Sequence, residues 1–137
     1  MNVDIALHTI EELEFSYKNS VINVTNFDAA NLQMHINLLK NIDLNLNLVN
    51  ILTIVTYTYN ELEVLKLQVR IDFAVPQLPH IITQNENNWQ LLEAIDTALQ
   101  SISYSTVRGF LAAKTQGLPL NKFYMPIVDP QQFANPV

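Results

Sequence analysis

The chain has 137 residues, of which 49% are hydrophobic and only 15% are charged, and its formal net charge is −6. This length suits one domain, and seven Lys and Arg residues are too few to follow a nucleic-acid backbone or an anionic membrane surface. The absence of cysteine excludes disulfides and thiolate metal sites and fits a reducing compartment.

The first two-thirds of the chain alternates between apolar and polar residues, a pattern typical of β-strands with one buried face. We expect strands over residues 5–17 and 52–59, and one long strand or two shorter ones over 32–48. The apolar residues change parity at 49–51, which predicts a bulge or a turn there. The clearest alternation covers 65–75, and the prolines that follow it cannot donate to a strand ladder.

From residue 88 the apolar residues recur at spacings of three and four, which predicts a long α-helix ending near Gly117 and Pro119. Its expected apolar stripe consists of Leu92, Ile95, Leu99, Ile102, Thr106, Gly109 and Ala113. Residues 118–137 carry four prolines and are expected to be extended. Strands followed by a helix indicate one α+β domain over 1–137, with a four-stranded antiparallel sheet, one long helix and an extended C-terminal segment.

Residues that commonly support catalysis or bind metals are scattered along the chain. His8, His35 and His80 fall on different expected elements, and none has a neighbour at metal-ligand spacing. The acidic cluster at 11–14 favours a solvated or edge-protecting strand face over acid–base catalysis. Patterns for phosphate loops, serine nucleophiles, zinc proteases and calcium loops are absent. We therefore expect no enzyme activity, no cofactor and no metal site.

The apolar surface of the expected elements exceeds what one small sheet and one helix need. The helix has a continuous apolar stripe, and residues 52–59 carry apolar side chains on both faces of their strand. Contiguous apolar surface of this kind marks interaction sites. We expect one of these surfaces to be covered by another subunit or by a bound polypeptide.

The order of the expected elements resembles the SecB family of protein-export chaperones, whose members have four antiparallel strands, a long helix and a C-terminal segment. The sequence Glu-Phe-Ser-Tyr at 14–17 is similar to the end of the family's first strand. The sequence Phe-Ala-Val at 73–75 is similar to the end of its last strand.

The most specific similarity to the SecB family lies within residues 107–133. Arg108 matches the family's helix arginine, and Gly-Leu-Pro-Leu-Asn at 117–121 matches the turn that follows the helix. Met-Pro-Ile-Val-Asp at 125–129, together with Phe133, is similar to its closing stretch.

The resemblance implies an ATP-independent holdase that binds unfolded or secretory polypeptides in apolar grooves and assembles as a homotetramer, or at least a dimer. It implies client-binding residues at strand ends and before the helix, although part of this set is equally suited to the core: Phe15, Tyr17, Val55, Tyr57, Phe73, Val75 and Leu78. A helix layer between subunits would contain Leu92, Ile95, Leu99 and Ile102.

Two features depart from the SecB family. Residues 101–105 read Ser-Ile-Ser-Tyr-Ser where members usually have proline and aromatic residues. The chain ends at Val137 without the acidic, basic and glycine-rich tail with which some members contact the translocase motor, so we do not expect that contact. A holdase that serves a toxin–antitoxin system fits as well as one that serves export.

Two other interpretations remain open: an oligomeric adaptor or structural protein of the same fold that binds one specific partner, and a small enzyme with a dispersed site. The location expected for all of them is the cytoplasm. The N-terminal residues Met-Asn-Val-Asp lack the basic start and apolar run of a signal peptide, and no apolar stretch reaches the ~18 residues that span a bilayer.

Overall fold

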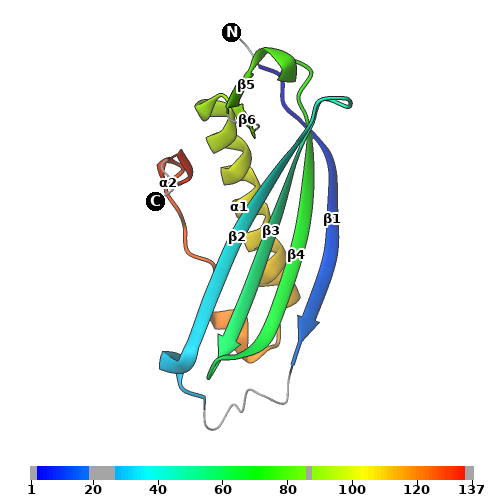
Figure 1. Cartoon of the computed structure of the whole chain (residues 1–137). Helices are drawn as coiled ribbons and strands as arrows, with labels where there is room; N and C mark the ends of the chain where they lie inside the picture. Colours follow the sequence, from blue (N-terminus) through cyan, green and yellow to red (C-terminus); the bar gives the residue numbers. More distant parts are fainter. Residues whose placement is uncertain (1–2, 19–26, 86–87, 135–137) are drawn as a thin grey trace.

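The computed structural model of the chain describes residues 3–18, 27–85 and 88–134. Its main sheet is antiparallel, has the strand order β1-β4-β3-β2, and consists of β1 (Ala6–Tyr17), β2 (Leu32–Asp43), β3 (Leu48–Tyr59) and β4 (Leu62–Ala74). Helix α1 (Glu93–Lys114) covers one face, which we call the inner face of the sheet (Figure 1). This architecture is α+β and confirms the expected fold class.

Shorter elements connect and extend this framework. They are the 3₁₀ helices η1 (Ala29–Asn31), η2 (Leu78–His80) and η3 (Pro119–Lys122), the strands β5 (Ile82–Asn85) and β6 (Asn88–Leu91), and the helix α2 (Gln131–Ala134). Strands β5 and β6 pair as a small antiparallel hairpin. Helix α1 therefore begins at Glu93, later than expected, because the residues before it belong to a strand.

The turn between β2 and β3 lies at residues 44–47 and not at 49–51 as expected. The Asp43 carboxylate accepts hydrogen bonds from the backbone N–H groups of Asn45 and Leu46, at 3.0 and 3.2 Å. Asp43 lies opposite Leu48, so even-numbered residues of β2 share a face with odd-numbered residues of β3. The parity change in the sequence therefore comes from the hairpin turn, and β3 continues through residues 49–51.

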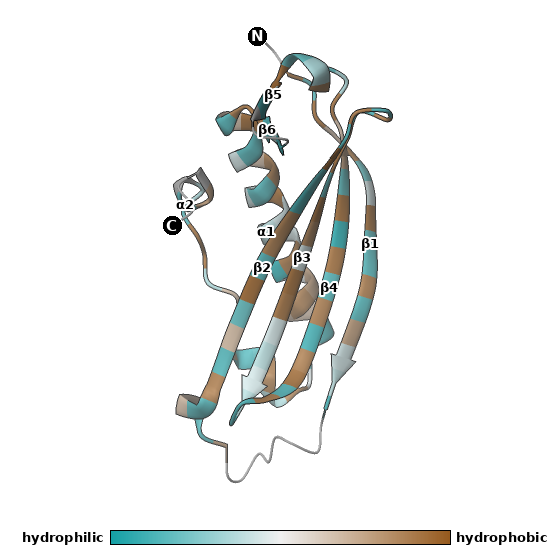
Figure 2. Cartoon of the chain, viewed as in Figure 1, coloured by the Kyte–Doolittle hydropathy of each residue, from teal (hydrophilic) through white to brown (hydrophobic). Residues whose placement is uncertain are grey.

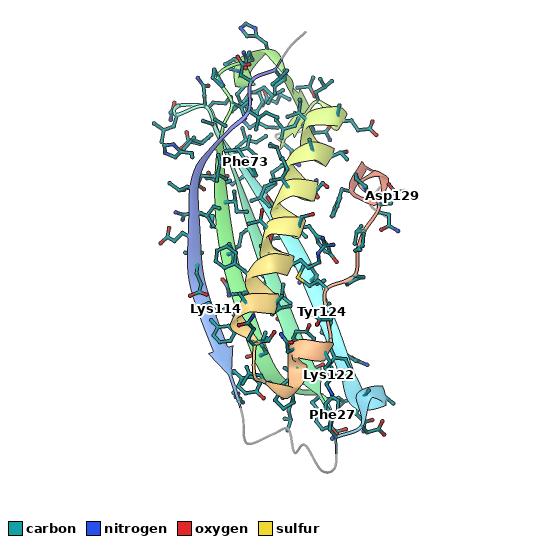
Figure 3. The ribbon with its side chains drawn as sticks, turned by 180° about the vertical axis from the view of Figure 1, so that it is seen from behind. Phe27, Phe73, Lys114, Lys122, Tyr124 and Asp129 are labelled. Atoms are coloured by element: carbon teal, nitrogen blue, oxygen red, sulfur yellow. The ribbon has the colours of Figure 1, made fainter. Side chains whose placement is uncertain are left out.

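Helix α1 crosses the inner face of the sheet diagonally. Near its first turn, Asp96 forms an ion pair of 2.9 Å with Lys40 of β2. At its last turn, Lys114 forms an ion pair of 2.8 Å with Glu12 of β1, at the opposite edge of the sheet. The helix therefore leaves the first half of β1 without a helical neighbour on the inner face (Figure 3).

The hydrophobic core lies between α1 and the inner face of β3 and β4. Odd-numbered residues of β3, and of β4 from Leu65 onward, are buried, and most of them alternate with more exposed ones, a pattern that corresponds to the bands along β4 in Figure 2. Leu99, Val107 and Leu111 complete the core from the helix. The buried stripe of α1 is rotated about the helix axis by roughly 100° from the predicted stripe. The predicted stripe contains Gly109, which has no side chain, and Ala113, whose methyl group would bury little apolar area against the sheet.

The C-terminal segment is extended only in part, because residues 119–122 form η3 and residues 131–134 form α2, and the stretch between them passes beside α1 (Figure 3). Residues 124–128, which we call the strap, belong to no helix or sheet. Two buried tyrosines hold the chain there: the Tyr57 hydroxyl donates to the Phe123 carbonyl, and the Tyr104 hydroxyl donates to the Pro126 carbonyl at 2.7 Å. The segment therefore depends on side-chain hydrogen bonds for its position.

Candidate functional site

The residues predicted to contact a client lie mainly in the core. On the strands they all face inward, because Phe15 and Tyr17 lie opposite core residues of β4. Phe15 and Tyr17 are partly buried. The other five, none of them more than 2% exposed, are Val55, Tyr57, Phe73, Val75 and Leu78. Val55, Tyr57 and Phe73 lie on the central strands beneath α1. Val75 and Leu78 follow β4 and are also fully buried, so none of the five offers surface to a client in this structure.

The residues predicted to form a helix layer between subunits divide into two groups. Leu99 is fully buried within the chain, and Ile95 is partly buried. Leu92 and Ile102 are 54% and 45% exposed and lie on the flank of α1 that does not pack on the sheet. Only Leu92 and Ile102 therefore present large apolar surface to a second molecule.

The acidic cluster of β1 is neutralised by neighbouring cations. On the outer face of the sheet, the Glu11 carboxylate lies 2.7 Å from the Arg70 guanidinium, and Glu14 lies 3.7 Å from Lys66. Glu12 points to the inner face, where Lys114 pairs with it and also lies over the Phe15 ring. Paired carboxylates of this kind stabilise an edge strand and provide no free acid–base pair.

Exposed apolar side chains that the sequence did not single out lie along β1. Leu7 and Ile10 face inward, opposite Phe73 and Ile71, in the half of the strand that α1 does not cover. Leu13 is also exposed and lies where the pairing of β1 with β4 shifts register. Leu7, Ile10 and the exposed residues Leu92 and Ile102 of the α1 flank therefore leave aliphatic surface uncovered on the helix side of the sheet.

An apolar pocket of about 610 Å³, which we call the end pocket, lies where α1 gives way to η3. Phe27 forms one wall and stacks on Tyr59, with ring centroids 5.2 Å apart, and its centroid lies 5.3 Å from that of Phe123. The remaining lining residues are Ala29, Gly117, Leu118, Pro119 and Lys122. Two aromatic rings, those of Phe27 and Phe123, line this open pocket and suit the side chains of an unfolded polypeptide, and Tyr59 supports Phe27 from the core. In the sequence, this pocket is indicated by the residues that end the helix, Pro119 and Gly117, of which Gly117 adopts a left-handed backbone conformation.

A second groove, of about 430 Å³, lies between α1 and the strap, and we call it the strap groove. Its helix side is formed by Ser105, Arg108, Gly109 and Ala112, and its strap side by Tyr124, Met125 and Ile127. Tyr124 and Ile127 are 64% and 88% exposed, whereas Met125 is buried. A glycine within a helix is the signal in the sequence that marks this groove.

The outer face of the sheet combines polar and apolar residues. Leu39 of β2 lies opposite Leu52 of β3, and Ile54 follows on the same face. Leu39 is exposed, and the other two are partly buried. The expectation that β3 carries apolar residues on both faces is therefore confirmed.

The described residues contain no group of three or more His, Asp or Glu side chains close enough to hold a metal ion. The three histidines are all exposed, on β1, β2 and η2. Among the described helices, none has both the length and the apolar character required to span a membrane. No family model, curated protein or solved structure matches this chain. The resemblance to the SecB family therefore stays a prediction that rests on the residues given above.

Proposed function

We propose that the chain is the subunit of a homo-oligomeric holdase chaperone that binds unfolded polypeptides without ATP. The observation that carries this proposal is the set of apolar side chains left exposed on the inner face of β1 and on the flank of α1. A chain that functions alone gains nothing from leaving Leu7, Ile10 and Ile102 in water, since burial of the exposed half of each would contribute on the order of 1 kcal/mol.

The proposed contact between subunits uses this exposed surface. Strand β1 is an edge of the sheet, and its unpaired side is open to a strand of a second copy. Such pairing would bring Leu7 and Ile10 beside the same residues of the second copy. Leu92 and Ile102 would contribute from the neighbouring flank of α1. This assembly retains the predicted roles of Leu92 and Ile102 and leaves Leu99 in the core of each subunit.

The proposed client site is the end pocket. Its lining is apolar and aromatic, and Leu118 and Phe123 are only partly buried. An extended client would insert one large side chain there, and further weak contacts along the apolar surface would add affinity without sequence specificity. This site replaces the core residues that the sequence suggested.

The test combines the mass of the particle with its effect on aggregation. Static light scattering at micromolar concentration should give at least twice the subunit mass of 15.6 kDa. A denatured model enzyme diluted from urea should aggregate less in its presence. Leu118→Ser should weaken this protection, whereas Leu46→Ser should not, because Leu46 is exposed in the β2–β3 turn and lies outside the end pocket.

Two results would contradict the proposal at different levels. If the unmutated protein gives no protection, the chaperone function is wrong. If Leu118→Ser stays folded and protects equally well, the function survives but the client site lies elsewhere.

An adaptor that binds one specific partner is the second candidate. The strap groove favours it, because a mainly apolar groove with one cationic side chain suits a selective contact. Such an adaptor would bind its partner with a fixed stoichiometry and would leave the aggregation of unrelated proteins unchanged.

We place the protein in the cytoplasm, because a chain without cysteine needs no oxidising compartment. For either candidate function we propose no catalytic residue, cofactor, nucleic-acid partner or membrane insertion. A contact with a translocase motor is not part of the proposal.

A further inference from the structure

The strap groove contains a glycine that the fold of the chain does not require. Gly109 lies within α1, where glycine is among the poorest helix formers. Its backbone is not in the left-handed region, which among the described glycines only Gly117 adopts. A Cβ atom added at Gly109 would meet nothing within 4 Å. Neither backbone conformation nor internal packing therefore explains this glycine, and its effect is to leave space at the bottom of the groove.

The strap provides unpaired backbone groups beside that space. Within the described part of the chain, the N–H groups of Tyr124, Met125, Ile127 and Val128 have no hydrogen-bond partner. The segment runs extended beside α1 (Figure 3), and the side chains of Tyr124 and Ile127 are largely exposed. Extended backbone with free donors pairs with another extended chain by the addition of a strand.

The groove also contains a cation without a counter-ion among the described residues. Lys40, Lys66, Arg70 and Lys114 each form an ion pair, but Arg108 forms none. Arg108 itself lines the groove, and its charge partly offsets the rise that burial causes in the pKa of Tyr104. A guanidinium beside an apolar groove favours a carboxylate, which it can bind with two hydrogen bonds.

We propose that the strap groove binds an extended peptide segment in which a large apolar residue stands next to an acidic one. The peptide backbone pairs with the strap, the apolar side chain fills the space over Gly109, and the carboxylate contacts Arg108. The free backbone donors favour a peptide over a small amphipathic acid, because only a peptide uses them. This selectivity goes beyond holdase activity and does not depend on it.

The test is fluorescence anisotropy of the full chain with a labelled, capped peptide of sequence Thr-Val-Thr-Ile-Glu-Val-Thr, compared with versions that carry Gln or Lys in place of Glu. The Glu peptide should bind about tenfold more tightly than the Gln peptide, as expected for a charge-assisted contact. In Arg108→Gln this difference should disappear. Equal binding of all three peptides to the unmutated chain would overturn the proposal.

The matched pair of variants is Gly109→Leu and Ala113→Leu. Both place leucine on exposed positions of α1, but only residue 109 lines the groove. Gly109→Leu should fold with an unchanged or higher melting temperature and lose at least about tenfold in peptide affinity, because leucine occupies the space that the peptide needs. Ala113→Leu should bind like the unmutated chain. Unchanged binding by Gly109→Leu contradicts the proposal, as does displacement of the peptide by octanoate at equal or lower concentration.

The outcome of the peptide-binding measurements is independent of the outcome of the aggregation assay. Peptide binding without protection against aggregation rejects the proposed function and supports the groove, and protection without selective peptide binding does the reverse.

Discussion

Two tyrosine hydroxyls connect the core to the C-terminal segment. Tyr57 lies in β3 and Tyr104 in α1, and both hydroxyls donate to backbone carbonyls of residues 123–126. Met125 fixes the same segment by burying its side chain between these anchors. The position of the strap therefore depends on a few side chains and not on a strand ladder.

Removal of the Tyr57 hydroxyl should destabilise the fold. Tyr57→Phe leaves the Phe123 carbonyl without its donor and should lower the free energy of unfolding by about 1–3 kcal/mol. Urea denaturation measures this change. Tyr124→Phe is the control and should have almost no effect, because Tyr124 is largely exposed. Equal losses in the two variants would mean that the hydrogen bond is not the cause.

Alkaline pH should weaken the same anchors. Burial raises the pKa of Tyr57 and Tyr104 above the ordinary value of 10.0, so the folded state retains both protons longer than the unfolded state. Their contribution to stability is fully present below about pH 10 and is lost as the pH rises through the raised pKa values. The free energy of unfolding should therefore fall above about pH 10. In a Tyr57→Phe, Tyr104→Phe double variant this fall should be less steep, and an unchanged slope would assign it to other groups.

At the scale of single elements, α1 contains one glycine and is followed by another, and the two have opposite roles. Gly117 adopts φ +80 in the turn that ends the helix region, a conformation that side chains with a Cβ rarely adopt. Gly109 has helical geometry and open space around it. The backbone conformation requires glycine at position 117 but not at position 109.

Alanine at these two positions should change stability in opposite directions. Gly109→Ala should stabilise the protein by about 0.5–1 kcal/mol, because alanine is the better helix former. Gly117→Ala should destabilise it by about 1–2 kcal/mol, because the left-handed backbone brings Cβ close to a carbonyl oxygen. Thermal unfolding of both variants checks this prediction. A destabilised Gly109→Ala would indicate an internal packing role for that glycine.

At the scale of the whole molecule, the diagonal path of α1 decides which apolar surface stays exposed. The helix begins over β2 and ends beside β1, so it covers β3 and β4 and leaves part of β1 open. The proposed oligomer uses this open surface together with the exposed flank of α1, whereas the subunit core lies between α1 and the sheet. Substitutions on the two sides of α1 should therefore have different consequences.

Ile102→Asp should dissociate the oligomer and leave the subunit folded, because Ile102 is exposed in the single chain. Leu99→Asp should unfold the subunit, since an unpaired charge in the core costs several kcal/mol. Light scattering measures the mass, and circular dichroism reports whether each variant is folded. A monomeric unmutated protein at micromolar concentration contradicts the oligomer, whatever the variants do.

The sequence alone determined the fold class and most strand positions. Two local periodicities made this possible. Apolar and polar residues alternate over 65–75, as the geometry of a strand requires, and apolar residues recur every three or four positions after residue 88, as the geometry of a helix requires. The turn was placed a few residues late, at 49–51, because a parity change shows that the chain reverses face but not where the reversal begins. The absence of common catalytic motifs could also be read directly.

Only the tertiary structure decided which apolar residues are core and which are surface. Val55, Tyr57 and Phe73 belong to alternating patterns like that of Leu7, yet they are buried because their strands are central and lie beneath α1. Helix α1 likewise has two overlapping apolar stripes, and the sheet buries the one that contains Val107 and Leu111. Periodicity defines the faces of an element, but burial depends on what packs against each face. Here the diagonal crossing of α1, fixed by contacts between residues far apart in the chain, made that choice.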